Sequence, residues 1–138
     1  RQIKLAEKYN LPVVIHSRDA TLDTYNILKE FKVKGVIHCF SGSLDVAKMY
    51  IKLGFKLGIG GVVTFKNSKL FEVVKELSSK DFILETDSPY LSPIRGEKNE
   101  PKNIPLIAEF ISSVRGVSIE KVQTDTTNNV KEIFNLKI

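Results

Sequence analysis

The chain has 138 residues, of which 42% are hydrophobic and 27% charged, a composition typical of a globular domain with a buried core. No apolar stretch approaches the length of a membrane span and the N-terminal segment lacks the pattern of a signal peptide, so we expect a cytoplasmic protein with no membrane partner. The single cysteine, Cys39, excludes an internal disulfide. The net charge of +5 favours anionic partners such as nucleic acids, with lysines on solvated helix surfaces as the alternative explanation.

Strand and helix patterns alternate along the chain. A first helical pattern ends before Pro12, because proline disfavours a helical conformation in the residue before it. The predicted strands cover residues 13–16, 36–39, 55–59 and 82–85, and the later helices cover residues 21–31, 44–53, 69–77, 105–114 and 119–136. The β-branched runs VVI and GVI suit strands that are buried on both faces, so the sequence predicts an α/β fold with a parallel sheet.

Several polar and glycine residues mark the ends of these helices. Ser43, Ser68 and Ser118 can accept hydrogen bonds from first-turn amides. Gly54 can take a left-handed conformation after a helix, and Pro105 suits a first helical position.

Four parallel strands leave two open sheet edges, whereas a closed barrel of eight strands has none. The helical pattern also begins at the first residues without a cap. We therefore expect residues 1–138 to form a single domain, the carboxyl-terminal half of a TIM (β/α)8 barrel, with its last four βα units and terminal helices. The exposed sheet edges would permit self-association.

Both histidines of the chain occupy equivalent places. His16 follows VVI and His38 follows GVI, and Asp87 lies after a third strand. The carboxyl ends of parallel strands meet on one face, so these three side chains are predicted to lie together. Imidazole and carboxylate ligands suit Zn²⁺, Mn²⁺ or Mg²⁺, and the alternative is a pair of histidines that are satisfied within the core.

Glu85 and Asp87 are candidate catalytic residues. Because they are two positions apart, they would face the same side of an extended strand. Asp87 lies nearer the loop and is predicted to be a metal ligand or the base for a metal-bound water, with Glu85 held lower by hydrogen bonds. If Glu85 instead makes a helix cap or a structural ion pair, its exchange for glutamine should spare metal binding.

Three further features each have two interpretations. Arg18 can hold a substrate phosphate or form an ion pair with Asp19. The glycines of residues 58–61 can admit a substrate close to the backbone or serve tight packing, which we favour because a P-loop ending is absent. Cys39 is predicted to serve packing rather than to act as a nucleophile.

Six segments follow one another along the chain: LPVVIHSRDA, GVIHCFSGS, GIGGVVTFKN, ILETDSPYLSP, RGEKNEP and TTNNVKEIF. In this order they resemble the second half of TatD-family metal-dependent deoxyribonucleases, a group within the metallohydrolase superfamily. The resemblance implies that His16, His38 and Asp87 are divalent-metal ligands and that an activated water attacks a DNA phosphodiester. It also implies that Arg18, Arg95 and Asn99 border the path of the substrate phosphates.

The family also has a His-x-His pair and a bridging glutamate that this sequence does not contain. The leading hypothesis is a DNA-cleaving metal-dependent hydrolase, in which the chain alone is inactive if those ligands are required. One alternative is a related metallohydrolase of a small ester or amide. The other is a non-catalytic fragment that binds nucleic acid or a protein partner.

Overall fold

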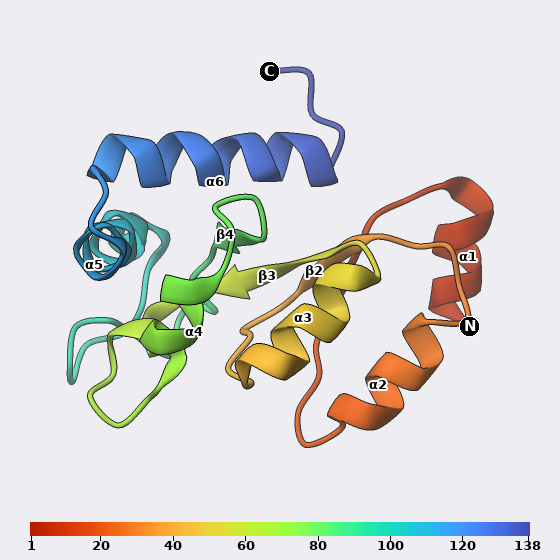
Figure 1. Ribbon diagram of the computed structural model, residues 1–138, viewed down its shortest axis with the longest axis horizontal. Helices are drawn as coiled ribbons and strands as arrows, with labels where there is room; N and C mark the ends of the chain where they lie inside the picture. Colours follow the sequence, from red (N-terminus) through yellow and green to blue (C-terminus); the bar gives the residue numbers. More distant parts are fainter.

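The computed structural model describes residues 1–138 as a parallel four-stranded sheet with helices between its strands (Figure 1). The strands are β1 (Val13–Ile15), β2 (Gly35–Ile37), β3 (Phe55–Ile59) and β4 (Phe82–Leu84). The helices are α1 (Gln2–Tyr9), α2 (Thr21–Leu28), α3 (Leu44–Lys52), α4 (Leu70–Glu76), α5 (Ile104–Arg115) and α6 (Ile119–Ile133), with short 3-10 helices η1 (Gly61–Thr64) and η2 (Pro101–Asn103). Each strand pairs in parallel with the next, in the order β1-β2-β3-β4. The predicted parallel β/α repeat is therefore confirmed.

The strands end earlier than the sequence pattern predicts. β1 and β2 stop immediately before His16 and His38, and β4 stops before Glu85. Cys39 has a φ of 48°, in the left-handed region that no strand residue adopts, so the chain turns there. The candidate site residues consequently lie on the loops that leave the strands.

The predicted helix ends are mostly correct. Ser43 accepts a hydrogen bond from the amide of Val46 and Ser118 accepts one from Lys121, as expected for N-caps. Gly54 takes the left-handed φ of 93° that follows α3. The longest helix, α6, has 15 residues, and none of the helices combines the length and apolar character that crossing a membrane requires.

Different elements pack against the two faces of the sheet. Leu57 and Ile59 of β3 are fully buried in the main core, where Ile111 of α5 packs with them. The opposite face forms a small cluster in which Val36 and Ile83 pack against α6, the helix that runs across β4 in Figure 1.

Burial on both faces holds for β2 and β3 but is wrong for β1. Val14 is 59% exposed. β1 is an edge strand, paired only with β2, and none of its three residues is fully buried.

Candidate metal centre

His38 stands where the pairing of β1 and β2 ends. Its backbone amide donates to the carbonyl oxygen of Ile15 over 2.9 Å, one step beyond the strands. Two residues later, the amide of Phe40 donates to the carbonyl oxygen of Gly58, also over 2.9 Å. The turn at Cys39 between these bonds thus has both ends fixed to the sheet, which fixes the backbone that carries the imidazole.

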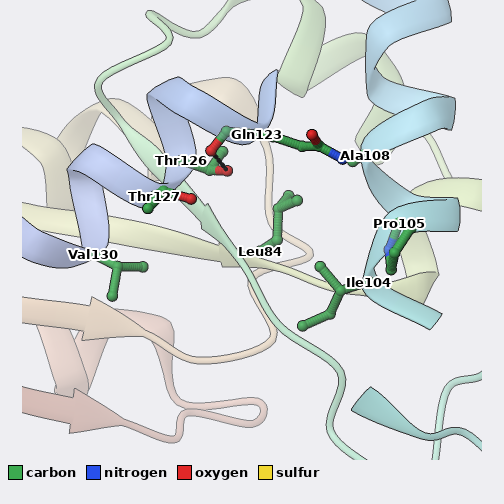
Figure 2. Close-up of a pocket in the computed structure, with 8 residues that line it drawn as sticks. All are labelled: Leu84, Ile104, Pro105, Ala108, Gln123, Thr126, Thr127 and Val130. Atoms are coloured by element: carbon green, nitrogen blue, oxygen red, sulfur yellow. Dashed lines mark hydrogen bonds between the residues drawn. The ribbon is translucent and has the colours of Figure 1, made fainter. Parts of the chain in front are cut away.

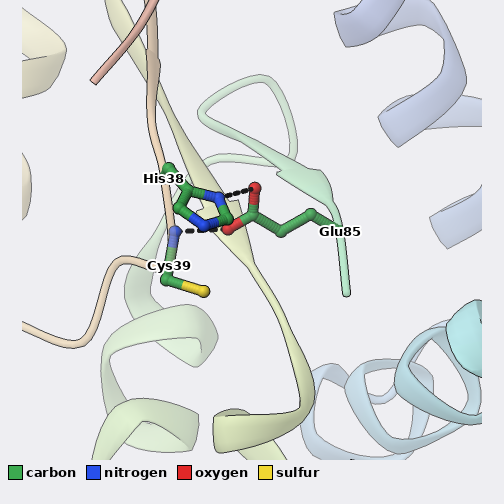
Figure 3. A group of neighbouring side chains, drawn as sticks. All are labelled: His38, Cys39 and Glu85. Carbon is green, nitrogen blue, oxygen red and sulfur yellow. Dashed lines mark hydrogen bonds and ion pairs between the residues drawn. The ribbon is translucent and has the colours of Figure 1, made fainter. Parts of the chain in front are cut away.

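Glu85 holds the same turn from the other side of β3. Its Oε2 lies 2.8 Å from His38 Nδ1, and its Oε1 accepts the backbone N–H of Cys39. Figure 3 shows the carboxylate facing the imidazole and this backbone nitrogen. An ionised carboxylate offers only acceptor oxygens, so opposite ionised Glu85 it is Nδ1 of His38 that carries the proton in this hydrogen bond. The prediction that hydrogen bonds hold Glu85 agrees with this geometry.

Asp87 faces the second nitrogen of the same ring. Its Oδ1 lies 3.0 Å from His38 Nε2. In the neutral imidazole with a proton on Nδ1, Nε2 presents a lone pair to this carboxylate, and two electron-rich atoms at that distance repel. A positive charge between or on these groups is needed to hold them together, and either a proton or a metal cation can supply it.

The titration behaviour of this cluster follows from the same charges. Burial lowers the pKa of His38, but hydrogen bonds and charges from Glu85 and Asp87 outweigh burial and raise the pKa above its usual value. Burial, with the same carboxylates, raises the pKa of Cys39 to about 12. The Cys39 thiol therefore stays protonated at neutral pH and is a poor nucleophile, as predicted from sequence.

The distances suit a divalent cation. Two adjacent ligands about 2.1 Å from an octahedral cation lie about 3.0 Å apart, which matches the separation of His38 Nε2 and Asp87 Oδ1. The ring of His16 lies beside that of His38, with centroids 6.2 Å apart. His16 and Asp87 therefore both lie next to the imidazole of His38. The side chain of His16 is exposed.

A second set of possible ligands overlaps the first. One potential ligand atom from each of His38, Cys39 and Glu85 lies within 4.8 Å of the others. Both carboxylate oxygens of Glu85 already accept N–H groups, and the Cys39 thiol is protonated without a metal. We therefore favour Nε2 of His38, Asp87 and His16 as the ligand set.

The predicted phosphate contacts differ in their placement. Arg18 and Arg95 are exposed, and no ion pair joins Arg18 to Asp19. Asn99 is only 2% exposed, and its amide nitrogen lies within hydrogen-bond distance of the carbonyl oxygens of Thr86, Tyr90 and Leu91. The loop backbone thus occupies the donors of Asn99, which holds the loop after β4. Its contact with substrate phosphates stays a prediction of the family resemblance.

Gly58 is a part of the site that the sequence pattern did not reveal. A Cβ atom at this position would lie 2.5 Å from the carboxylate of Glu85, so only glycine leaves room for that side chain. The favoured explanation of the glycines, tight packing, is therefore confirmed at residue 58. The signal was present in residues 58–61, but the sequence does not reveal which side chain fills the space.

A separate cavity of about 180 Å³ lies between α5, α6 and the end of β4 (Figure 2). Its lining carries no histidine, carboxylate or basic side chain; the residues are Leu84, Ile104, Pro105, Ala108, Gln123, Thr126, Thr127 and Val130. Such a lining offers neither a metal ligand nor a general base. This cavity therefore gives no reason to move the candidate site away from the cluster around His38.

The structure thus places a histidine between two carboxylates at the carboxyl edge of a parallel β/α sheet, the edge at which β/α barrels build their active sites. The chain belongs to the TatD related DNase family, whose model matches residues 1–135.

Relatives and a solved structure match nearly the whole chain. It is 45% identical to the uncharacterized metal-dependent hydrolase YabD of Bacillus subtilis, over 98% of this chain and 55% of the relative. It is 40% identical to the deoxyribonuclease TATDN3 of Homo sapiens, over 97% of this chain and 49% of that protein. The crystal structure of YJJV, a TatD homolog from Escherichia coli, has a TM-score of 0.91 and 32% identity, with coverage of 98% of this chain and 54% of that one. The chain thus spans about half the length of these relatives, and the predicted partial barrel is confirmed.

Proposed function

We propose that this chain carries part of the metal centre of a hydrolase that cleaves DNA phosphodiester bonds. The observation that carries the proposal is His38, whose two ring nitrogens face Glu85 and Asp87 at 2.8 and 3.0 Å. Membership of the TatD related DNase family and the likeness to a human deoxyribonuclease favour DNA as the substrate. The net charge of +5 is consistent with an anionic substrate.

Each residue of the cluster has a separate task in this proposal. His16, His38 and Asp87 hold a divalent cation, Mg²⁺, Mn²⁺ or Zn²⁺, which when bound supplies Lewis acidity and activates water for hydrolysis. Glu85 accepts a hydrogen bond from the Nδ1–H group of His38, which leaves the lone pair of Nε2 free to bind the metal. Asp87 is in addition the group placed to accept a proton from the attacking water.

Arg18 and Arg95 are proposed to hold substrate phosphates. Both side chains are exposed and neither makes an ion pair, so their charges are available to an anion. A guanidinium can contact two phosphate oxygens at once, which makes arginine well suited to positioning a phosphodiester.

The test compares the purified chain with its His38→Ala variant on single-stranded DNA and on small ester and amide substrates, with Mn²⁺, with Mg²⁺ and with EDTA. Cys39→Ser is the matched control, because it alters a neighbour that the favoured ligand set does not use. We expect metal-dependent DNA cleavage that is lost in His38→Ala and kept in Cys39→Ser. Hydrolysis of the small substrates alone would assign the site to other chemistry. No cleavage by the unaltered chain would mean that the family ligands absent from this sequence are required, and salt-sensitive DNA binding that survives EDTA and His38→Ala would favour a nucleic-acid-binding module.

A further inference from the structure

We infer that the hydroxyl groups of Ser17, Thr24 and Tyr50 position His16 for the metal by holding the loop that leaves β1. These three side chains, the hydroxyl cluster, are positioning residues and touch neither the metal nor the substrate. The inference rests on the proposed function, since it takes His16 as a metal ligand, and it identifies what holds that ligand in place.

His16 is not held in the way that His38 is held. Each ring nitrogen of His38 has a carboxylate partner, Glu85 on one side and Asp87 on the other. The imidazole of His16 is exposed and makes no hydrogen bond, although its ring centroid lies only 6.2 Å from that of His38. The position of the His16 ring therefore depends on the backbone that carries it.

The backbone after β1 has little support of its own. The carbonyl oxygen of Ile15 accepts the amide of His38, but residues 16–19 make no backbone–backbone hydrogen bond. Asp19 takes a left-handed φ of 52°, and Ala20 at the start of α2 offers no side-chain cap. A backbone in such a sparsely populated conformation persists only where its surroundings hold it.

The hydroxyl cluster attaches this loop to two helices. Ser17 Oγ lies 2.9 Å from Thr24 Oγ1, in the first turn of α2. The Tyr50 hydroxyl donates to the carbonyl oxygen of Thr21, the first residue of α2, over 3.3 Å. Tyr50 belongs to α3 and is 2% exposed, so its phenol is fixed in the main core. Because α2 and α3 pack against each other (Figure 1), the loop is attached to both.

The three hydroxyl groups lie close enough to influence one another. Burial raises the pKa of Tyr50, and hydrogen bonds with Ser17 and Thr24 offset part of this rise. The phenol therefore keeps its proton at neutral pH and remains a donor to the start of α2. Loss of any one hydroxyl removes a partner from the others, so all three are expected to contribute.

The alternative is that the hydroxyl cluster only stabilises the packing of α2 and α3. Its loss would then lower the free energy of unfolding and leave the Mn²⁺ affinity of the folded chain unchanged. If the cluster instead acts through His16, removing it weakens metal binding only while His16 is present. A double-mutant cycle between His16 and Ser17 separates these two roles.

The experiment measures Mn²⁺ affinity of the purified chain by isothermal titration calorimetry. The cycle consists of the unaltered chain, His16→Ala, Ser17→Ala and the double variant H16A/S17A. Thr24→Val and Tyr50→Phe remove the other two hydroxyls with little change of shape, and Thr24→Ser restores the hydroxyl at residue 24. Urea denaturation of each variant shows how much of the chain is folded under the conditions of the titration.

Two matched controls remove hydroxyls elsewhere. Tyr25→Phe alters a tyrosine of α2 whose hydroxyl makes no hydrogen bond, and Thr124→Val alters an exposed threonine of α6. Both should change Mn²⁺ affinity less than about 2-fold, the usual scatter between independent sites.

We expect Ser17→Ala and Thr24→Val each to weaken Mn²⁺ binding about 10-fold, the lower end of the range for groups that orient metal ligands. Tyr50→Phe should weaken it about 3-fold, as for the loss of one hydrogen bond, and Thr24→Ser should stay near the unaltered chain. His16→Ala should weaken binding about 10-fold or more, and the double variant H16A/S17A should match His16→Ala within about 2-fold.

Unchanged affinity in Ser17→Ala and Thr24→Val, or equal losses from Ser17→Ala with and without His16, would overturn the inference and leave the proposed ligand set standing. Unchanged affinity in His16→Ala, or no binding by the unaltered chain, would overturn the inference together with that ligand set.

Discussion

His38 Nδ1 and Glu85 Oε2 lie 2.8 Å apart, across two strand ends that are 47 residues apart in the chain. This hydrogen bond fixes which ring nitrogen carries the proton and directs the other nitrogen toward Asp87. Partners of this kind orient metal ligands, and their loss typically weakens metal affinity about 10–100-fold.

Glu85→Gln is therefore expected to weaken Mn²⁺ binding by about 10–100-fold in isothermal titration calorimetry. The amide keeps the shape of the side chain, but it has one acceptor oxygen for two N–H donors, from His38 and Cys39. The NH₂ group of the glutamine would then face the second N–H group, and two donors cannot form a hydrogen bond with each other.

Glu76→Gln serves as the control for Glu85→Gln, because Glu76 is an exposed residue of α4 without an ion pair. Equal Mn²⁺ affinity in Glu85→Gln and the unaltered chain would mean that Glu85 forms only a structural ion pair and does not orient a metal ligand.

Gly58→Ala tests whether the space for Glu85 is essential. The added methyl group would lie 2.5 Å from the carboxylate, so the side chain has to move. We expect a loss of about 1–3 kcal/mol in the free energy of unfolding, as for other overpacked sites. Mn²⁺ affinity should fall as it does in Glu85→Gln.

Gly60→Ala is the matched control for Gly58→Ala. Its methyl group would meet the carbonyl oxygen of Glu85 at 3.5 Å, an ordinary contact, and its backbone φ of −111° suits alanine. Urea denaturation and calorimetry of both variants check the prediction. A Gly58→Ala chain with unchanged stability and metal affinity would contradict it.

The sequence was sufficient to predict the strand order and the meeting of the strand ends, because buried β-branched runs and helix caps are local signals. It was not sufficient for the surroundings of Asn99, which only the family resemblance singled out. Its burial depends on the path of the loop, whose carbonyl oxygens from Thr86 to Leu91 converge on its amide. Likewise, the exposure of Val14 depends on whether another element packs against that face of β1, a tertiary property without a local pattern.

Asn99→Ala is expected to loosen the loop after β4. The substitution leaves the carbonyl oxygens of Thr86 and Tyr90 without the amide that now donates to them over 2.6 and 2.8 Å. Trypsin can cut this loop at Arg95 and Lys98, so we expect cleavage there to be several-fold faster, since protection depends on how firmly the loop is held.

Mass spectrometry of a timed digest identifies the cut positions in the Asn99→Ala chain. Asn128→Ala, a change of the same kind at an exposed position on α6, should leave the rate unchanged. Equal rates in the two variants would mean that other contacts hold the loop.

Asn129 attaches α6 to the start of β4. It is 3% exposed, and its amide nitrogen donates to the carbonyl oxygens of Ser79 and Phe82, both over 2.7 Å. Alanine would leave these two carbonyl oxygens without a donor in the interior. We expect Asn129→Ala to lower the free energy of unfolding by about 1–3 kcal/mol, the usual consequence of leaving a buried polar group unsatisfied.

The adjacent Asn128 is the matched control, because it has the same side chain on the same helix but is exposed to solvent. Asn128→Ala should change the free energy of unfolding by less than about 0.5 kcal/mol. Urea denaturation followed by circular dichroism gives both values, provided that the slope of the free energy of unfolding against urea concentration is the same in both variants. Equal effects at the two positions would mean that packing of Val122 and Ile133, rather than the amide of Asn129, attaches α6 to the sheet.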